Sequence, residues 1–191
     1  MKRAKWISDS LQAFSEQRIH VRPRRYVSGE MQFYLGRRHV LKVAIDPIKK
    51  PQVKMDRGKL LVTLPDDEIT KSDRVKELVG QWYRTRAQHV FRARLEQLVP
   101  ELPWVDTAPE FRVLAMSKQW GSCSARGALM LNPHLVKAPR DCIDYVILHE
   151  LCHIKEHNHS ERFYRLLGRV MPEWRPVKQQ LDDMAELILN E

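Results

Sequence analysis

The sequence has few cysteines and no long apolar run, and both absences limit what the protein can be. Its 191 residues include three cysteines, Cys123, Cys142 and Cys152, with no CxxC pair. Three is too few for a disulfide framework, and cysteine-based zinc fingers need paired thiolates. No stretch approaches the roughly 18 apolar residues of a membrane span, and the basic start at residues 1–5 lacks the apolar segment of a secretory signal. We therefore expect a protein of the reducing cytoplasm.

Glycine-rich linkers and internal repeats are absent as well. Only 7 residues are glycine and 11 are proline, while 43% are hydrophobic, which is enough to form a core. This length favours one domain, or one domain with an extension. The chain divides most simply into a basic N-terminal extension at residues 1–24, an N-terminal β region at 25–68 and a catalytic domain at 69–191.

Positive charge is concentrated in the first third of the chain. Residues 1–60 hold 15 Lys and Arg against 5 Asp and Glu, a net charge of +10, whereas residues 61–110 and 111–191 carry −2 and +1. A local field of this kind attracts phosphate-bearing or other anionic partners. The alternative, which stays open, is a solvated surface that serves solubility.

The hydrophobic pattern predicts an α+β fold in which a β-rich region and a long helix precede a second, mixed unit. Apolar and alternating runs predict strands at 32–35, 39–45, 52–55 and 60–64, with a hairpin turn at 56–58. From Thr70 or Ser72 to Pro100, apolar residues recur at helical spacing, which predicts one long helix.

The last 80 or so residues mix short strands with helices. Strands are predicted at 111–116 and 128–131, with a turn-rich stretch at 120–127 between them. The pattern then predicts a helix after Asp141 or Asp144, a second from Ser160 (as its N-cap) to Pro172, and an amphipathic helix at 177–189.

The most specific motif is an HExxH sequence, formed by His149, Glu150 and His153. On a helix, residues i and i+4 lie on one face, so both imidazoles can bind one metal ion. Glu150 lies on a neighbouring face, where its carboxylate can accept a proton from metal-bound water. Neutral imidazole suits zinc, although other first-row divalent metals also accept it. We predict a zinc site with Glu150 as the catalytic residue.

A catalytic zinc needs a third protein ligand, and His159 is our prediction. It follows His153 by six residues, and Asn158 can take the left-handed conformation that ends helices, which would turn His159 back toward the ion. His157 would lie a further turn away on a continued helix. Glu173 is the alternative carboxylate ligand, although it fits a helix-ending turn better. The competing interpretation of the motif is a pair of surface histidines on a buried helix.

Five segments form a recognisable set: residues 120–124 (WGSCS), 129–132 (LMLN), 143–153 (IDYVILHELCH), 158–160 (NHS) and 171–174 (MPEW). Together they resemble the YgjP-like metallopeptidase family, zincin-class hydrolases related to the SprT and WLM types. The resemblance covers roughly residues 25–190. It implies a small zincin-like core with a metal on His149, His153 and His159, Glu150 as general base, and a strand within 120–132 at the edge of the cleft. Such an edge would suit peptide capture.

These observations predict a metal-dependent hydrolase, most simply a zinc metallopeptidase that acts on peptide or protein substrates. Two alternatives remain open. The basic first third could gather a nucleotide for phosphoanhydride hydrolysis, although no GxxxxGK phosphate loop is present. It could instead bring a protease to proteins bound to nucleic acid, with Trp6, Arg22, Arg24 and Arg25 on the phosphates. No membrane partner is expected.

Overall fold

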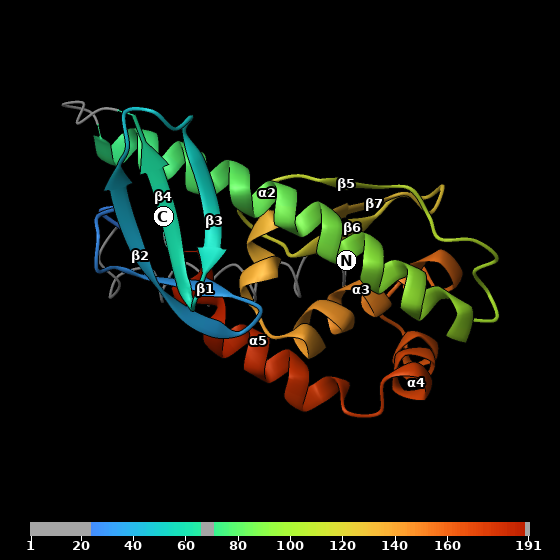
Figure 1. Cartoon of the computed structure of the whole chain (residues 1–191). Coiled ribbons are helices and arrows are strands. Elements are labelled where there is room, and N and C mark those ends of the chain that lie inside the picture. The colour runs from blue at the N-terminus through green and yellow to red at the C-terminus, as the bar shows by residue number, and fades with distance from the viewer. Residues whose placement is uncertain (1–23, 66–70, 190–191) are drawn as a thin grey trace.

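The computed structural model describes residues 24–65 and 71–189, and Figure 1 draws the other residues as a thin grey trace. The predicted extension at 1–24 lies outside the described residues except for Arg24, as do Trp6, Arg22 and the helix cap at Thr70. The described part is α+β, as predicted: a four-stranded sheet, a long helix, a three-stranded sheet and three further α-helices. No helix in this part is long and apolar enough to cross a membrane.

The N-terminal sheet forms where the strand pattern predicted it. Its strands are β1 (Met31–Tyr34), β2 (Arg37–Ile45), β3 (Gln52–Asp56) and β4 (Lys59–Leu64), in the order β1-β2-β4-β3. β2 runs parallel to β4, and the other neighbouring strands are antiparallel. The predicted turn joins β3 to β4. Arg57 and Gly58 both have positive φ (45° and 78°), as a two-residue hairpin turn requires.

The strands place apolar side chains on one face of this sheet. Leu41 on β2 and Leu60 on β4 are fully buried, whereas the adjacent Lys42 and Lys59 are exposed. The buried face contacts α2 (Lys71–Leu98), a helix of 28 residues whose apolar stripe follows the predicted spacing. Figure 1 shows α2 running from this sheet to the three-stranded one. One helix therefore supports both sheets.

The three-stranded sheet has shorter strands than predicted, and one strand more. β5 (Phe111–Val113) stops three residues short of its predicted end, and β6 (Gly121–Cys123) forms inside the stretch predicted as turns. With β7 (Leu129–Leu131) the order is β5-β7-β6, and β6 runs antiparallel to β7. β6 is thus an edge strand of the described sheet, and it lies within the region where the family resemblance implied one.

Three α-helices complete the described chain: α3 (Arg140–Lys155), α4 (Glu161–Val170) and α5 (Trp174–Leu189), with short 3-10 turns η1 (Val99–Glu101) and η2 (Pro133–Lys137). Neither predicted aspartate caps α3, because the helix starts before both, with Pro139 at its N-cap. α5 also begins three residues earlier than predicted. Ser160 caps α4 as predicted, since its Oγ accepts a hydrogen bond from the backbone N–H of Phe163 at 3.3 Å.

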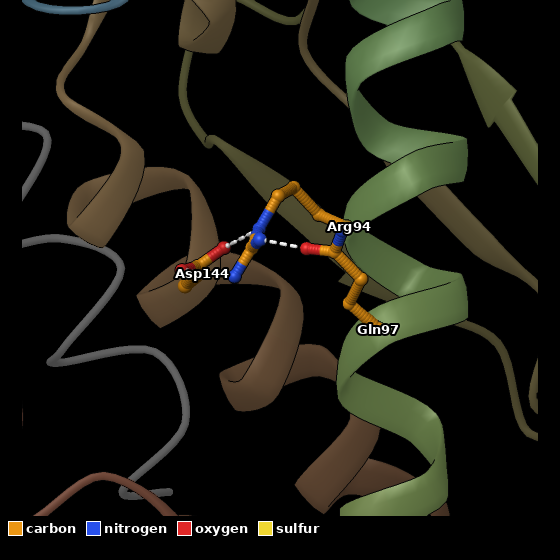
Figure 2. Close-up of polar contacts among 3 residues, drawn as sticks. All are labelled: Arg94, Gln97 and Asp144. Carbon is orange, nitrogen blue, oxygen red and sulfur yellow. Dashed lines mark hydrogen bonds and ion pairs between the residues drawn. The ribbon is translucent and has the colours of Figure 1, made fainter.

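An ion pair joins the long helix to α3. Arg94 donates from Nε and Nη2 to the two carboxylate oxygens of Asp144, at 2.6 and 2.7 Å, and from Nη1 to Gln97 (Figure 2). The Arg94 and Asp144 side chains are only 20% and 14% exposed. A bidentate, partly desolvated pair of this kind is stronger than an ion pair at the surface. It fixes α3, which carries the HExxH motif, against the helix that supports both sheets.

Candidate metal centre and cleft

α3 is a central helix, and the motif residues lie toward its C-terminal end. Apart from Asp144, every residue from Cys142 to Cys152 is buried. His149 and Glu150 are each 7% exposed, and His153, one turn later, is half-buried. Polar groups are costly to bury unless they find partners or ligands. Two imidazoles and a carboxylate on so buried a helix therefore point to a site.

The chain reverses after α3 and brings His159 next to the motif. The helix ends at Lys155, and Glu156 adopts an extended conformation (φ −125°, ψ 96°) while its N–H still bonds to the carbonyl of Cys152 at 2.9 Å. The predicted left-handed conformation of Asn158 is wrong, since Asn158 is not among the described non-glycine residues with positive φ. The extended residue at Glu156 suffices because it takes the chain off the helical path in a single step.

The three imidazoles converge through their Nε2 atoms. His159 Nε2 lies 2.9 Å from His149 Nε2 and 3.2 Å from His153 Nε2. The Nδ1 atom of His153 lies 3.0 Å from the carbonyl oxygen of Glu156. Because a carbonyl can only accept, this Nδ1 carries the proton and the lone pair of Nε2 faces the other two rings.

The electrostatics of the triad favour a neutral His149. Burial, followed by the charges that His153 and His159 would carry, holds the pKa of His149 well below its usual value. A histidine must be neutral to bind a metal. Three imidazoles that each offer one nitrogen within 4.8 Å of the others could hold a metal ion, and this donor set suits zinc.

The alternative ligands do not join this group. Among the described residues, the cluster that could hold a metal contains the three histidines alone. His157 lines the same cavity but is exposed, and Glu173 is exposed just before α5. Cys152 lies inside the motif, is fully buried, and burial raises the pKa of its thiol to about 12. It is therefore a packing residue.

Glu150 lies against the edge strand. A Cβ added at Gly121 on β6 would come within 2.9 Å of Glu150 Cγ and 3.0 Å of its Oε1. Only glycine leaves room for this carboxylate, since any side chain at residue 121 would have to displace it. Burial raises the pKa of Glu150 to about 8. The carboxyl group is thus held in a dry, close-fitting position, and it lines the same cavity as the triad.

The histidines and Glu150 share one cavity of about 780 Å³. One wall is formed by β6 and the loop before it, residues 115–120, and the facing residues are Tyr145 on α3 and Lys178, Leu181 and Asp182 on α5. Lys178 forms an ion pair with Asp182 one turn along the helix. Sequence reasoning missed the α5 residues, because an isolated Lys and Asp on an amphipathic helix form no motif.

A buried amide holds the wall next to β6. Asn132 is 1% exposed, and its Nδ2 donates to the carbonyls of Met116 (2.7 Å) and Gln119 (3.1 Å) while its Oδ1 accepts from the N–H of His134 (3.1 Å). Its backbone N–H also bonds to the carbonyl of Trp120 at 2.8 Å. These bonds fix the loop that leads into β6. A single asparagine after a strand gave no signal of this role.

Almost the whole chain matches one known protein family. The model of the YgjP-like metallopeptidase domain matches residues 1–184. The chain is a member of this family. This match confirms the resemblance that the sequence motifs indicated. The group of His149, His153 and His159 is where this member could bind a metal ion.

Two solved structures are similar to about half of this YgjP-like chain. One is the metallopeptidase zymogen jannalysin of Methanocaldococcus jannaschii, with 22% identity, a TM-score of 0.44, and coverage of 50% of this chain and 96% of that chain. The other is the metallopeptidase zymogen abylysin of Pyrococcus abyssi, with 25% identity, the same TM-score of 0.44, and coverage of 51% and 94%. Among curated proteins there is no match.

Proposed function

We propose that this protein is a zinc-dependent peptidase in which His149, His153 and His159 hold the metal and Glu150 is the catalytic base. The convergence of three Nε2 atoms beside a buried carboxylate, in one cavity, carries this proposal. Zinc bound there would polarise the scissile carbonyl and make a water nucleophilic at neutral pH. Three protein ligands are typical of catalytic zinc sites, which keep one position open.

Glu150 moves the proton. Its carboxylate accepts a proton from the attacking water and delivers it to the leaving amine, the role of a general acid–base group within reach of the reacting atoms. The absence of a side chain at Gly121 leaves the room that the carboxylate occupies during both transfers. The chain therefore contributes two things directly, a ligand set and a positioned base.

The substrate binds as an extended strand along β6. The outer edge of β6 has no neighbour in the described sheet, so its backbone groups can pair with a peptide. Because Gly121 lies on this strand beside the Glu150 side chain, a peptide paired to β6 passes the base. Family membership supports a protein or peptide substrate.

The Glu150→Gln variant tests the proposed mechanism. The amide keeps the shape of the side chain but cannot take the proton, so the variant should retain its metal by elemental analysis. It should lose at least about 100-fold in the rate of cleavage of a labelled, unfolded polypeptide. Glu161→Gln, a change at an exposed glutamate on α4, is the matched control. Full turnover in Glu150→Gln would remove this residue from the mechanism, and turnover that survives chelation would remove the metal.

Hydrolysis of a nucleotide phosphoanhydride is the less favoured reaction for the same centre. Among the described residues, the Lys and Arg side chains that line the cavity are Lys118 and Lys178, and Lys178 is already paired with Asp182. This leaves little positive charge for a triphosphate. Nucleoside triphosphates and an unfolded polypeptide should be assayed in parallel, with and without chelator. Faster turnover of a nucleotide would reverse the assignment.

We also propose that the solvent face of the N-terminal sheet binds the phosphate backbone of nucleic acid. The strand register places Lys42 on β2 and Lys54 on β3 on either side of Leu61, and all three side chains share the face opposite the core. Arg38 and Lys59 lie on the same face, which holds one acidic residue of these strands, Asp56. Four exposed cations against one acid complement a polyanion.

Charge reversal tests this surface. The double variant Lys42→Glu/Lys54→Glu should weaken binding to both single-stranded DNA and RNA by more than about 10-fold at low salt, and it should flatten the salt dependence. Arg162→Glu/Arg169→Glu, two exposed residues on α4, applies the same charge change elsewhere. Equal losses in both double variants would show a response to net charge alone. Binding to anionic vesicles but not to nucleic acid would assign the face to a lipid surface instead.

A further inference from the structure

One phenylalanine contacts all three histidines of the triad. The ring centroid of Phe163 lies 4.8 Å from that of His149, 4.6 Å from that of His153 and 4.8 Å from that of His159. The three imidazole centroids lie 4.6 to 5.0 Å from one another. The four rings therefore occupy the corners of a nearly regular tetrahedron, with Phe163 equally close to each histidine.

Phe163 lies on the side of the triad that faces away from the cleft. Its side chain is fully buried, and it is absent from the cavity lining although all three histidines belong to that lining. A phenyl ring has no ligand atom and excludes water. Any fourth ligand, from water or substrate, must therefore approach from the cavity side.

A packed ring can help to hold the triad in its ligating state. Metal binding requires that each ring present a bare Nε2 lone pair, and such lone pairs repel at the 2.9 Å between His149 and His159 and the 3.2 Å between His153 and His159. His153 also meets the carbonyl of Glu156 through its Nδ1. Packing adds a restraint on ring rotation, and Phe163 is a side chain that packs on all three rings.

We propose that Phe163 is a positioning residue of the metal centre, and this rests on the proposed ligand set. It holds the three imidazoles in their ligating orientation before a metal arrives and closes the inner side of the site. A triad prepared in this way binds metal without the entropy cost of ordering three side chains.

Phe163 and His159 lie at the same end of α4, on either side of its N-cap residue Ser160. His159 immediately precedes Ser160, and the Oγ of Ser160 accepts a hydrogen bond from the N–H of Phe163. The cap therefore fixes the histidine and its support in one turn of chain. His159 also stacks on Tyr164 (6.2 Å between centroids), which in turn stacks on Trp174 (5.2 Å) and meets Phe163 edge-on (5.4 Å). His159 thus packs against two adjacent rings of α4.

Substitution of Phe163 tests the proposal through metal binding rather than activity. Phe163→Leu keeps an apolar side chain but removes the flat ring, and Phe163→Met replaces the ring with a longer, flexible chain. Phe91→Leu, at a fully buried phenylalanine on α2, is the matched control for loss of core packing. For each full-length variant, we would measure zinc affinity by chelator competition, the visible spectrum of the cobalt-substituted protein, and the unfolding of the metal-free protein.

We expect both Phe163 variants to lose about 10- to 100-fold in zinc affinity, the range seen when the support of a metal ligand is removed, and to change the cobalt spectrum. Phe91→Leu should match Phe163→Leu in the unfolding of the metal-free protein, yet bind zinc as the wild type does. Unchanged zinc affinity and spectrum in both Phe163 variants would overturn the positioning role while leaving the proposed function intact. A wild-type protein that binds no divalent metal would overturn both.

Discussion

The two sheets of this molecule differ in regularity. The N-terminal sheet has strands of four to nine residues, and its solvent face carries lysines. The second sheet has strands of three residues, and its edge strand carries Gly121 and lines the cavity. The hydrophobic periodicity of the sequence predicts the first sheet, whose solvent face is positively charged. The second sheet depends on contacts with neighbouring elements, and it borders the candidate site.

The two sheets should therefore differ in how well they tolerate amino-acid substitutions. A regular strand keeps its position when a solvent-facing side chain is replaced, because the ladder and the buried face hold it. A strand of three residues depends on single contacts, such as the fit of Gly121 against Glu150 and the bonds of Asn132. Changes near the second sheet should therefore alter chemistry and leave anion binding intact, and changes on the first sheet should do the reverse.

The largest effect should follow from His159→Ala. Loss of one of three ligands should lower zinc affinity by more than about 100-fold, beyond the range that the loss of an outer support costs, and should abolish peptide cleavage. His157→Ala is the matched control, because it removes an exposed imidazole from the same loop and cavity. Chelator competition gives the affinities. If His157→Ala proved the more damaging of the two, the third ligand would have to be reassigned.

Gly121→Ala should come next. The added Cβ would lie 2.9 Å from Glu150 Cγ and 3.1 Å from Val146 Cγ1, so the base or the strand must shift. A displacement of this order costs about 100-fold in turnover, while zinc content should remain at the wild-type level. Gly80→Ala makes the same chemical change on α2, where the new Cβ meets only the end of Arg84 at 3.7 Å. That control should be as active as the wild type and slightly more stable.

Arg94→Met probes the joint between the helix shared by both sheets and α3. The change leaves Asp144, 14% exposed, without its bidentate partner, and should lower the free energy of unfolding by about 2 kcal/mol. Arg74→Met, in an exposed pair with Glu77, should cost less than about 0.5 kcal/mol. Chemical denaturation provides both values. Equal costs would show that the Arg94 pair contributes no more than a surface contact.

The smallest effect concerns the thiols. Burial raises the pKa of Cys123 on β6 to about 11 and that of Cys142 on α3 to about 12, so both stay protonated and react slowly at neutral pH. Cys123 is partly exposed and Cys142 is fully buried, so alkylation of the native protein should modify Cys123 first. Mass spectrometry after a timed reaction with iodoacetamide distinguishes them. Modification of Cys142 at the rate of Cys123 would mean that α3 opens readily.

The sequence predicted those parts of the fold that are encoded locally. The first sheet, its hairpin and α2 follow from periodicity and turn residues, and HExxH spacing on a helix places His149 and His153 together by geometry alone. The hydrophobic pattern did not predict β6, because Gly-Ser-Cys has little strand preference and pairs only where β7 and α3 hold it. Only the family resemblance implied an edge strand in this region.

The surroundings of the candidate site were predicted in part. His159 was expected beside the motif and lies there, but the reversal occurs through the extended Glu156 and not through Asn158. Backbone conformation at one residue depends on the tertiary contacts that follow it, so propensity alone chose the wrong residue. Lys178 and Asp182 come from α5, far along the chain, and only packing brings them to the cavity.

The short length of β6 would limit which proteins such an enzyme can cleave. An edge of three residues, unpaired within the described part of the chain, can accept only a partner that arrives already extended, with its own backbone groups unsatisfied. Natively folded proteins have few such segments, because their strands are paired and their edges protected. A damaged or incompletely folded chain has many. Selection would then act on the conformation of the target and not on its residues, so intact neighbours would escape cleavage without a dedicated inhibitor.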